Sequence, residues 1–309
     1  MRVVFMGTPA FAVAVLRQLV EDRWDVAAVY SQPDKPKNRG MKLIPTPVKE
    51  YALTAGIPVF QPESCRDAAV LEQLRGLEPD VIVVAAYGKL LPQALLEIPK
   101  KAIINVHSSL LPQYRGAAPI NWAVLNGDRE TGVTIQYMVR ELDAGDILLA
   151  KSTPIGPEED AGQLYDRLAV LGGEAASEAL ALLERGEAPR TPQAYGPQYQ
   201  YAGLLSREMS PLDWSRPAQD LVNQVRGLIP WPCAATDVAG VQWKVFRAHA
   251  GEETGRAPGT ILSADKNGVA VACGDGRALV ITELQAPGGK RMAAADYLRG
   301  HPVPLPGRS

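Results

Sequence analysis

The run Asp80–Ala86 constrains the fold more than any other part of this sequence, because every residue after the aspartate is apolar. A strand with one face in water alternates apolar and polar side chains, whereas a strand that is apolar throughout is buried on both faces. Burial on both faces is the usual situation in a parallel sheet that carries helices on either side. The run therefore predicts such a sheet at the centre of an α/β domain.

The first half of the chain alternates predicted strands with predicted helices. This β-α-β order predicts a Rossmann-like parallel sheet. The turn Gly7-Thr8-Pro9 after the first strand lacks the G-x-G-x-x-G pattern, so a dinucleotide is not indicated. The glycine pair Gly172-Gly173 lowers the helix propensity in the middle of the longest predicted helix. The other strands are expected at Arg2–Met6, Val26–Tyr30, Ala102–Val106, Thr134–Met138 and Ile147–Lys151, and the helices at Ala10–Val20 and Ala161–Arg185.

The composition changes after the long predicted helix. The stretch Glu187–Tyr201 is rich in proline, glutamine, glycine and tyrosine without periodicity, which is typical of a linker. A short helix at Pro217–Arg226 is followed by short β-like runs with Asn-Gly and Asp-Gly turns, which indicate a small barrel. We therefore expect a first domain at 1–188, a linker at 189–206 and a β-barrel domain at 207–309. The β-like runs are Gln242–Ala248, Gly259–Ser263, Gly268–Ala272 and Ala278–Leu284.

Length and composition are compatible with two such domains, since the chain has 309 residues of which 46% are hydrophobic. The N-terminus starts directly as a strand and lacks the features of a signal peptide. No apolar run approaches the roughly twenty residues that span a bilayer, so we expect a cytoplasmic protein without membrane contact. The cysteines Cys65, Cys233 and Cys273 are far apart and the three histidines are scattered. Neither a disulfide nor a metal site is therefore expected.

Two side chains with catalytic potential emerge together at the end of a predicted strand. Asn105 and His107 lie two residues apart, so on a strand they point to the same face. An amide stabilises a developing oxyanion, and an imidazole transfers protons near neutral pH. Asp143, in the turn Leu142–Asp146, offers a carboxylate that orients such an imidazole. An Asn-x-His motif alone is most often structural, but the long loop that follows this one favours a catalytic interpretation.

The block Asn105–Pro119, together with Asp143-Ala144-Gly145, resembles the folate-dependent formyltransferases. That family carries an Asn-x-His motif, a Ser-Leu-Leu-Pro loop and a downstream Asp-x-Gly in the same order. Several fixed positions over about forty residues rarely coincide by chance. The resemblance implies that Asn105, His107 and Asp143 are the catalytic residues.

Further segments resemble the branch of that family that acts on methionyl-tRNA, namely Val4–Pro9, Ser31–Lys49, Asp213–Ala218 and Pro230–Pro232. The resemblance implies a Rossmann-like catalytic domain and an OB-like C-terminal barrel that binds tRNA. It also implies transfer of the formyl group of 10-formyltetrahydrofolate to the free amino group of methionyl initiator tRNA by a monomer without a metal. The stretch Tyr201–Ser206 lacks a lysine that the family usually has there, so we assign no contact to it.

The same resemblance suggests which residues bind the folate. Ser109, Leu110, Leu111 and Pro112 would wall the pterin together with the Asp143 turn, and Tyr87 and Gly88 would line the same opening. Core packing explains Leu110 and Leu111 equally well.

The loop Gln32–Lys49 is basic and is punctuated by proline and glycine, as surface loops are. Composition alone favours a solvated charged loop. In the resembled family this loop inserts into the acceptor end of the tRNA, and Arg39 matches its key arginine. We therefore expect Lys35, Lys37, Arg39 and Lys42 to contact tRNA. The net charge of −2 leaves room for such a local patch, and residues 206–309 hold 12 basic against 10 acidic side chains.

Three other functions remain open on the sequence. A formyltransferase for a nucleotide sugar or for glycinamide ribotide would need neither the basic loop nor the added barrel. A non-enzymatic RNA-binding protein on this scaffold would be expected to lose one of Asn105, His107 or Asp143. A formyl-folate hydrolase would carry a different N-terminal module.

Overall fold

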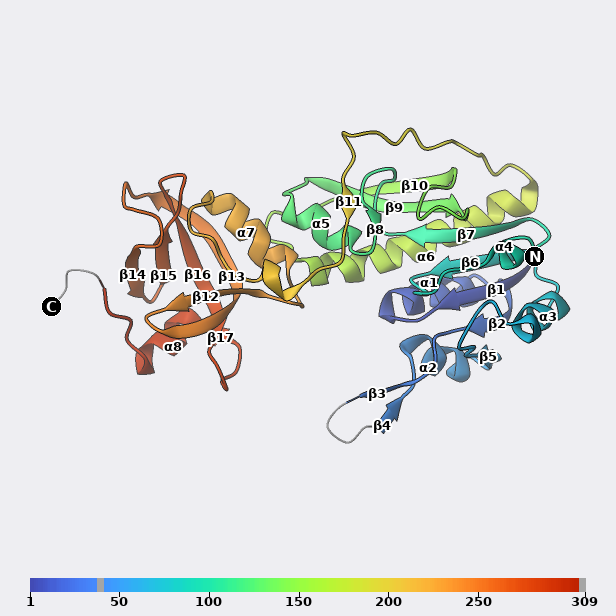
Figure 1. The fold of residues 1–309 in the computed structure, drawn as a ribbon, viewed down its shortest axis with the longest axis horizontal. Coiled ribbons are helices and arrows are strands. Elements are labelled where there is room, and N and C mark those ends of the chain that lie inside the picture. The colour runs from blue at the N-terminus through green and yellow to red at the C-terminus, as the bar shows by residue number, and fades with distance from the viewer. Residues whose placement is uncertain (38–41, 306–309) are drawn as a thin grey trace. The chain divides into compact units, whose positions relative to one another are not determined.

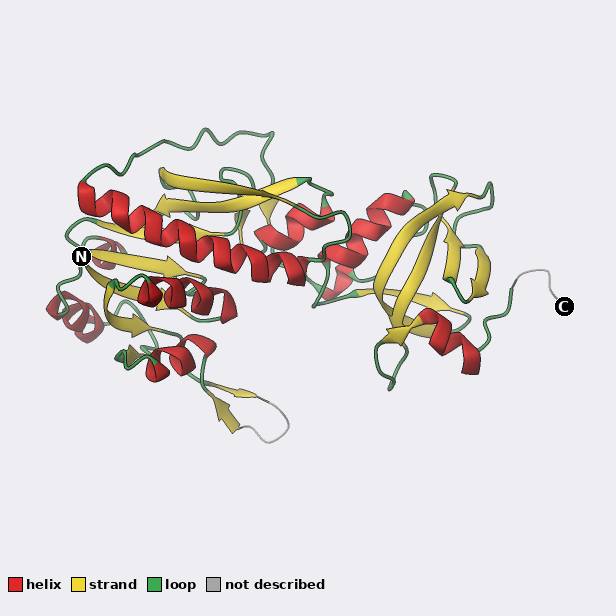
Figure 2. Ribbon diagram, turned by 180° about the vertical axis from the view of Figure 1, so that it is seen from behind, coloured by secondary structure: helices red, strands yellow, loops and turns green. Residues whose placement is uncertain are grey.

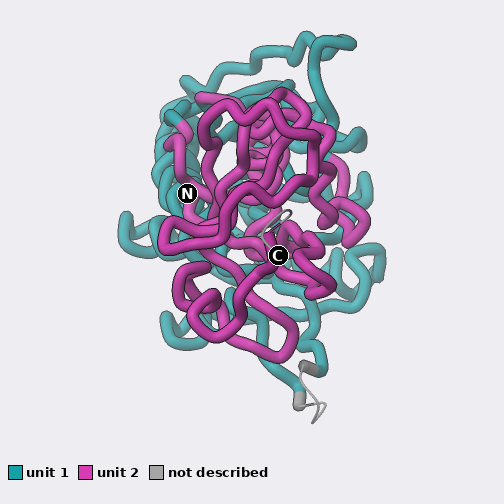
Figure 3. Tube along the Cα trace, turned by 90° about the vertical axis from the view of Figure 1, so that its left-hand side faces the viewer, with its two compact units in different colours: residues 1–119, 130–154, 165–202 teal, residues 120–129, 155–164, 203–309 magenta. Residues whose placement is uncertain are grey.

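The computed structural model describes residues 1–37 and 42–305 and divides into two compact units (Figure 3). Unit 1 comprises residues 1–119, 130–154 and 165–202. Unit 2 comprises residues 120–129 and 155–164 and the chain from Gly203 onward. The expected division treated each domain as one continuous stretch. Two short segments within the expected first domain group with unit 2, and most of the expected linker groups with unit 1.

Unit 1 is built on a seven-stranded sheet in the order β10-β9-β7-β6-β1-β2-β5 (Figure 1). The strands from β5 to β7 pair in parallel, as predicted. β9 is antiparallel to β7 and to β10, so the sheet is mixed rather than wholly parallel. The connection between β9 and β10, residues 138–146, is too short for the crossover of a dozen or more residues that a parallel pair needs, so these two strands pair antiparallel. These strands are β1 Arg2–Gly7, β2 Asp25–Tyr30, β5 Val59–Phe60, β6 Val81–Ala85, β7 Ala102–His107, β9 Glu130–Tyr137 and β10 Ile147–Pro154.

Smaller elements connect these strands. A hairpin of β3 and β4 and a parallel pair of β8 and β11 lie outside the main sheet. The long helix α6 matches its predicted bounds and is not interrupted at the glycine pair. The elements are β3 Lys35–Lys37, β4 Lys42–Ile44, β8 Arg115–Gly116, β11 Tyr201–Ala202, α1 Ala10–Glu21, α2 Pro47–Thr54, α3 Ala68–Gly76, α4 Gln93–Leu96, α5 Pro119–Leu125 and α6 Ala161–Arg185.

The two faces of β7 have different coverings. Val106 points toward α1 and α6, since a Cβ on Gly172 would lie 3.1 Å from Val106 and 3.4 Å from Phe11. Figure 2 shows α6 and α1 on this face of the sheet. Asn105 and His107 alternate with Val106 and therefore point to the other face. There the apolar core of the neighbouring strands includes Ile103 and Tyr87, so the functional side chains adjoin a well-packed core.

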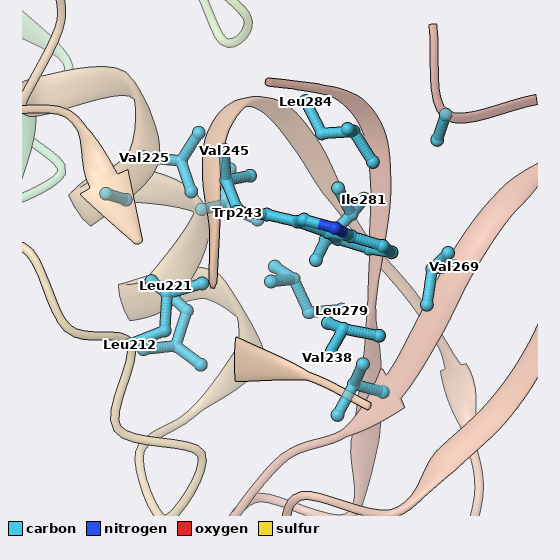
Figure 4. Packing of buried hydrophobic residues seen from close by; sticks show 14 of the residues in the cluster. Leu212, Leu221, Val225, Val238, Trp243, Val245, Val269, Leu279, Ile281 and Leu284 are labelled. Carbon is cyan, nitrogen blue, oxygen red and sulfur yellow. The ribbon is translucent and has the colours of Figure 1, made fainter. Parts of the chain in front are cut away.

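Unit 2 contains an antiparallel sheet in the order β12-β13-β16-β15-β14, with β17 beside β16. The antiparallel strands confirm a β-sheet domain in the region 207–309, and α7 matches the helix expected at Pro217–Arg226. Trp243 lies at the centre of its core beside Val238, Ile281 and Leu284 (Figure 4). The elements are β12 Ala234–Val238, β13 Val241–Glu253, β14 Ile261–Asp265, β15 Gly268–Ala272, β16 Arg277–Gln285, β17 Met292–Ala293, α7 Ala218–Gly227, α8 Ala294–Gly300 and a 3₁₀ turn at Arg207–Met209.

Across residues 1–37 and 42–305, no helix combines the length and the apolar character that crossing a membrane requires.

The glycine pair in α6 marks a close approach of two helices, which gives a test of the packing. A Cβ on Gly173 would lie 2.8 Å from the Gln18 Cβ and 3.2 Å from the backbone oxygen of Ala14. We expect Gly173→Ala to lower the free energy of unfolding by about 1–2 kcal/mol, because the overpacking cost of up to about 3 kcal/mol outweighs the gain of about 1 kcal/mol in helix propensity. Gly76→Ala, in α3, meets open space and should be neutral or stabilising. Urea unfolding of both variants measures the difference, and a stabilised Gly173→Ala protein would contradict this account of the packing.

Candidate active site

Strand pairing places four polar side chains together on one face of the sheet. In the β7–β9 register Asn105 lies opposite Gln136, and His107 lies opposite Thr134. Residues directly opposite each other in an antiparallel pair share a face. Asn105 and His107 therefore gain Gln136 and Thr134 as neighbours on the face that the spacing predicts.

Thr134 fixes the start of the loop that follows His107. Its buried hydroxyl donates to the Ser109 carbonyl at 2.7 Å and accepts from the Leu111 amide at 3.0 Å. The Ser109 hydroxyl donates to the Gln113 carbonyl at 2.6 Å, which tightens the same loop. This folding brings the Tyr114 carbonyl to 2.9 Å from the Nε2 atom of His107.

Asp143 approaches the other side of the His107 ring from the turn between β9 and β10. Its Oδ1 lies 3.6 Å from the Nδ1 of His107. Gln136 Nε2 donates to that Oδ1 at 3.1 Å, and the Gly116 amide donates to Oδ2 at 2.9 Å. The turn packs so tightly that a Cβ on Gly145 would lie 1.7 Å from the Tyr137 carbonyl oxygen. The Asp-x-Gly motif therefore needs its glycine for steric reasons.

The His107 ring is buried, with 6% of its surface exposed, and both of its nitrogens face acceptors. A carbonyl accepts hydrogen bonds only, and so does an ionised carboxylate. Nε2 can therefore donate to the Tyr114 carbonyl, and the Asp143 carboxylate lies on the Nδ1 side of the ring, where it can pair with the imidazole. Tyr114 and Asp143 both have positive φ angles, 60° and 50°, a sparsely populated backbone conformation that often marks functional sites.

The Asn105 side chain is half-buried and, in the part of the chain that the structure describes, its amide makes no hydrogen bond. An amide that is free to donate beside an imidazole can hold an anionic oxygen of a substrate.

A hollow of about 90 Å³ adjoins Asp143 and has Gln136 in its wall. The rest of its lining comes from Lys89–Leu91 and from the other residues of Tyr137–Gly145. Leu90, Val139 and Leu142 are 77%, 41% and 56% exposed. Large apolar side chains that gather around an opening commonly mark a ligand site. A volume of this size suits a single ring, because pockets for whole drug-sized ligands measure roughly 300–1,000 Å³.

The residues expected to bind folate do not line this hollow, and several of them are buried. The Tyr87 side chain is 1% exposed and belongs to the core, where its hydroxyl lies 3.4 Å from the sulfur of Cys65. Ser109 and Leu111 are also buried, and Leu110 and Pro112 are half-buried. Gly88 is exposed and follows Tyr87 directly, at the start of the segment that reaches the hollow. For Tyr87 only the backbone is available to a ligand in this structure.

The basic loop contains a short hairpin that the sequence did not predict. β3 pairs with β4, and Lys35 is exposed. Lys37 and Lys42 occupy the last paired positions of this hairpin, and Arg39 lies outside the described residues. At its base Lys49 Nζ contacts Asp34 Oδ2 at 2.6 Å, and Gln61 Nε2 donates to Asp34 Oδ1 at 2.6 Å. These hydrogen bonds, the Lys49 one first, hold the pKa of the Asp34 carboxyl below its usual value.

Sequence reasoning missed several residues of the site. Gln136, Tyr114 and Gly116 contact the trio directly. The signal for Gln136 was present, because it alternates with Thr134 on a predicted strand. The contacts of Tyr114 and Gly116 depend on the path of a loop, which no periodicity encodes. Among the described residues no cluster of histidine, cysteine, aspartate and glutamate is suited to a metal ion.

Comparison with known proteins identifies relatives along almost the whole sequence. The model of a family described as formyl transferase matches residues 1–180, and that of the formyl transferase C-terminal domain matches residues 204–302. The methionyl-tRNA formyltransferase of Trichlorobacter lovleyi is 51% identical over 305 residues, which represent 98% of this chain and 95% of that protein.

Solved structures show a similar fold at low identity. The N-formyltransferase from Helicobacter canadensis, in complex with folinic acid and dTDP-3-aminofucose, has a TM-score of 0.68 at 17% identity and covers 90% of this chain and 98% of its own. HypX from Aquifex aeolicus, in complex with tetrahydrofolic acid, has a TM-score of 0.61 at 22% identity and covers 96% of this chain and 47% of its own. At these identities the likeness shows the fold alone.

The ion pair at the base of the basic loop predicts a pH-dependent stability. Because the pKa of Asp34 is lowered on folding, the stabilisation is present above the ordinary aspartate value of about 3.9 and is lost as the pH falls through the lowered value. We expect Asp34→Asn to lower the free energy of unfolding at pH 7 by about 0.5–1 kcal/mol. Urea unfolding from pH 7 to pH 3 should show this difference shrinking at the acid end, and a difference that stays constant would contradict the assignment.

Proposed function

The chain belongs to the formyl transferase family, among the methionyl-tRNA formyltransferases, and we propose that Asn105, His107 and Asp143 carry out its reaction. In that reaction the formyl group of 10-formyltetrahydrofolate passes to the free amino group of methionyl initiator tRNA. The observation that carries the assignment is the His107 ring between Asp143 and Tyr114, with the unpaired Asn105 amide on the same face.

The hollow beside Asp143 fits one ring of the formyl donor. Its exposed apolar side chains offer a surface for a flat ring, and its backbone groups offer hydrogen bonds. Leu90, Val139 and Leu142 would lie against the pterin, in addition to the segment Ser109–Pro112. The folate supplies the formyl group, which it carries on a nitrogen atom. The protein supplies the groups that bind the donor and stabilise charge during the transfer.

The chemical step requires stabilisation of negative charge. The amine nitrogen of the methionyl group bonds to the formyl carbon, charge builds on the formyl oxygen, and the bond from that carbon to the donor nitrogen breaks. Asn105 would donate its amide hydrogen to this oxygen, and a protonated His107 would stabilise it by its charge. A well-placed donor of this kind lowers a barrier by roughly 3–4 kcal/mol.

One proton must leave the amine and one must reach the departing nitrogen. The Nε2 atom of His107 lies 2.9 Å from the Tyr114 carbonyl oxygen, and its Nδ1 faces Asp143. Direct transfer through His107 would break one of these contacts. The geometry therefore supports an electrostatic role for His107, with water as the proton carrier.

The β3–β4 hairpin is the surface that we assign to the acceptor end of the tRNA. The sequence between Gln32 and Lys49 carries Lys35, Lys37, Arg39 and Lys42, and Lys49 is excluded from this role because Asp34 neutralises it. Phosphate contacts from such residues give affinity, and they release counterions from the RNA.

Unit 2 has a hollow of its own, where two arginines could meet a phosphate of the tRNA flank. It measures about 240 Å³ and includes Arg226, Arg247 and His249 in its lining. Glu158 and Asp160 line the same hollow and limit the net charge. Binding there would therefore be weak for a free anion and would depend on contacts elsewhere along the RNA.

The catalytic assignment predicts the effect of two substitutions. His107→Ala and Asn105→Ala should each lower formyl transfer by about 10²-fold or more, because each removes a group that stabilises the developing oxyanion. The measurement follows labelled formyl from 10-formyltetrahydrofolate to methionyl initiator tRNA, with circular dichroism as the folding control. If the wild-type protein transferred no formyl group, the proposed function would be refuted. If either variant were fully active, the substituted residue would have no part in the mechanism.

The RNA assignment predicts the effect of a surface substitution. Arg39→Ala should reduce kcat/KM for charged tRNA at least about 10-fold, because neighbouring lysines cannot reproduce the fork of a guanidinium. Affinity for tRNA should also depend less steeply on salt than in the wild type. Arg66→Ala, at an exposed arginine of unit 1 outside the basic loop, is the matched control and should leave both quantities unchanged. If the Arg39 and Arg66 variants had equal kinetics, Arg39 would not contact the tRNA, and the loop would be a solvated surface loop without a role in RNA binding.

A further inference from the structure

The segment that the sequence indicates as a linker is bound to the catalytic unit along much of its length. Thr191 exchanges two backbone hydrogen bonds with Ile147, at 2.8 and 3.0 Å. Further on, β11 pairs in parallel with β8, and the Tyr114 amide donates to the Gln200 carbonyl at 2.9 Å. The segment therefore runs beside both the Asp143 turn and the loop that follows His107.

Gln193 makes the central side-chain contacts of this segment. Its Nε2 lies 2.9 Å from the Asp143 carbonyl oxygen, 2.7 Å from that of Gly145 and 3.3 Å from the Gln136 Oε1. Its Oε1 accepts from Arg115 Nε at 3.0 Å and from Arg115 Nη2 at 2.8 Å. Arginine only donates and carbonyl oxygens only accept, so the chemistry of the neighbours fixes this orientation of the amide.

The contact with Gln136 extends to the catalytic carboxylate. With Gln136 Oε1 held by Gln193, Gln136 Nε2 is turned toward Asp143 Oδ1 at 3.1 Å. A free Gln136 amide could rotate and present its oxygen to the carboxylate, which would repel it. On the other side, Arg115 directly precedes Gly116, whose amide donates to Asp143 Oδ2. Gln193 thus supports both hydrogen bonds that hold the Asp143 carboxylate.

We propose that Gln193 is a positioning residue for formyl transfer: its amide ties the Asp143 turn to the loop after His107 and fixes the carboxylate against the imidazole. Gln193 itself touches no reacting atom. The proposal rests on the proposed function, because the ring that it aligns is the one assigned to the reaction. It also gives the segment 189–202 a role in the active site in place of that of a passive connection.

Neighbouring aromatic contacts strengthen the attachment of the segment. The Arg115 guanidinium lies 4.3 Å from the Tyr195 ring centroid, and the Arg190 guanidinium lies 3.6 Å from that of Tyr137 at the end of β9. A cation held over an aromatic face in this way is attracted to the ring. The segment therefore stays in place when Gln193 alone is changed, which makes a substitution at this residue informative.

The test compares three variants of the full-length protein. Gln193→Met keeps the length of the side chain and removes all its hydrogen bonds. Gln193→Glu keeps an acceptor for Arg115 but removes the donor to the Asp143 turn. Gln198→Met, at an exposed glutamine of the same segment, is the matched control. We expect kcat for formyl transfer to fall about 10-fold or more in both Gln193 variants, with KM for folate and tRNA within about 2-fold of wild type.

This kinetic pattern distinguishes positioning from a general structural role. A loosened fold would raise KM or lower the melting temperature along with kcat, and either result would overturn the proposal. Wild-type kcat in Gln193→Met would overturn it as well. If Gln193→Glu were fully active while Gln193→Met was not, the contact with Arg115 would be sufficient for activity. The proposed link from Gln193 to the Asp143 turn would then be wrong.

Hydrogen exchange provides a readout that is independent of catalysis. The Gly116 amide and the turn 139–146 should exchange at least about 10-fold faster in Gln193→Met than in wild type and in Gln198→Met. Unchanged protection would overturn the proposal even in an active enzyme. Because this measurement needs no substrate, it separates a failure of the proposed clamp from a failure of the proposed function.

Discussion

The site depends on the placement of one buried ring between two acceptors. His107 meets the Tyr114 carbonyl at one nitrogen and the Asp143 carboxylate at the other. To provide these neighbours, the backbone adopts left-handed conformations at Tyr114 and Asp143, each of which costs on the order of 1 kcal/mol. The Thr134 hydroxyl, the Gly116 amide and Gln136 hold the strained segments in place. A single ring orientation thus explains the conformation of two separate loops.

The antiparallel strand β9 makes this arrangement possible. It lies beside β7 in reverse, so that Gln136 and Thr134 share a face with Asn105 and His107. The turn that follows β9 then folds over the same face and brings Asp143 back to the ring. In a parallel arrangement the chain would leave this neighbourhood through a long crossover. The departure from a purely parallel sheet is therefore part of the construction of the site.

Sequence patterns predicted the features that depend on periodicity or on short spacing. The apolar run at β6, the bounds of α6 and the shared face of Asn105 and His107 all follow from such patterns. Features that depend on contacts between segments far apart in the sequence could not be predicted from such patterns. Gln193 lies in a stretch without periodicity, and its partners are 48 to 78 residues away in the sequence. Tyr87 illustrates the reverse case, because its position after a strand suggested a pocket while its ring is buried in the core.

The most direct test of the account is the kinetics of Asp143→Asn, since this change keeps the shape of the side chain and removes its charge. If Asp143 acts through His107, single-turnover transfer from 10-formyltetrahydrofolate to methionyl initiator tRNA should fall by about 10²-fold or more. The Kd for the folate, measured on the same protein by calorimetry, should change less than about 3-fold. A variant that transfers formyl at the wild-type rate would contradict the account and leave Asp143 as a residue of the turn only.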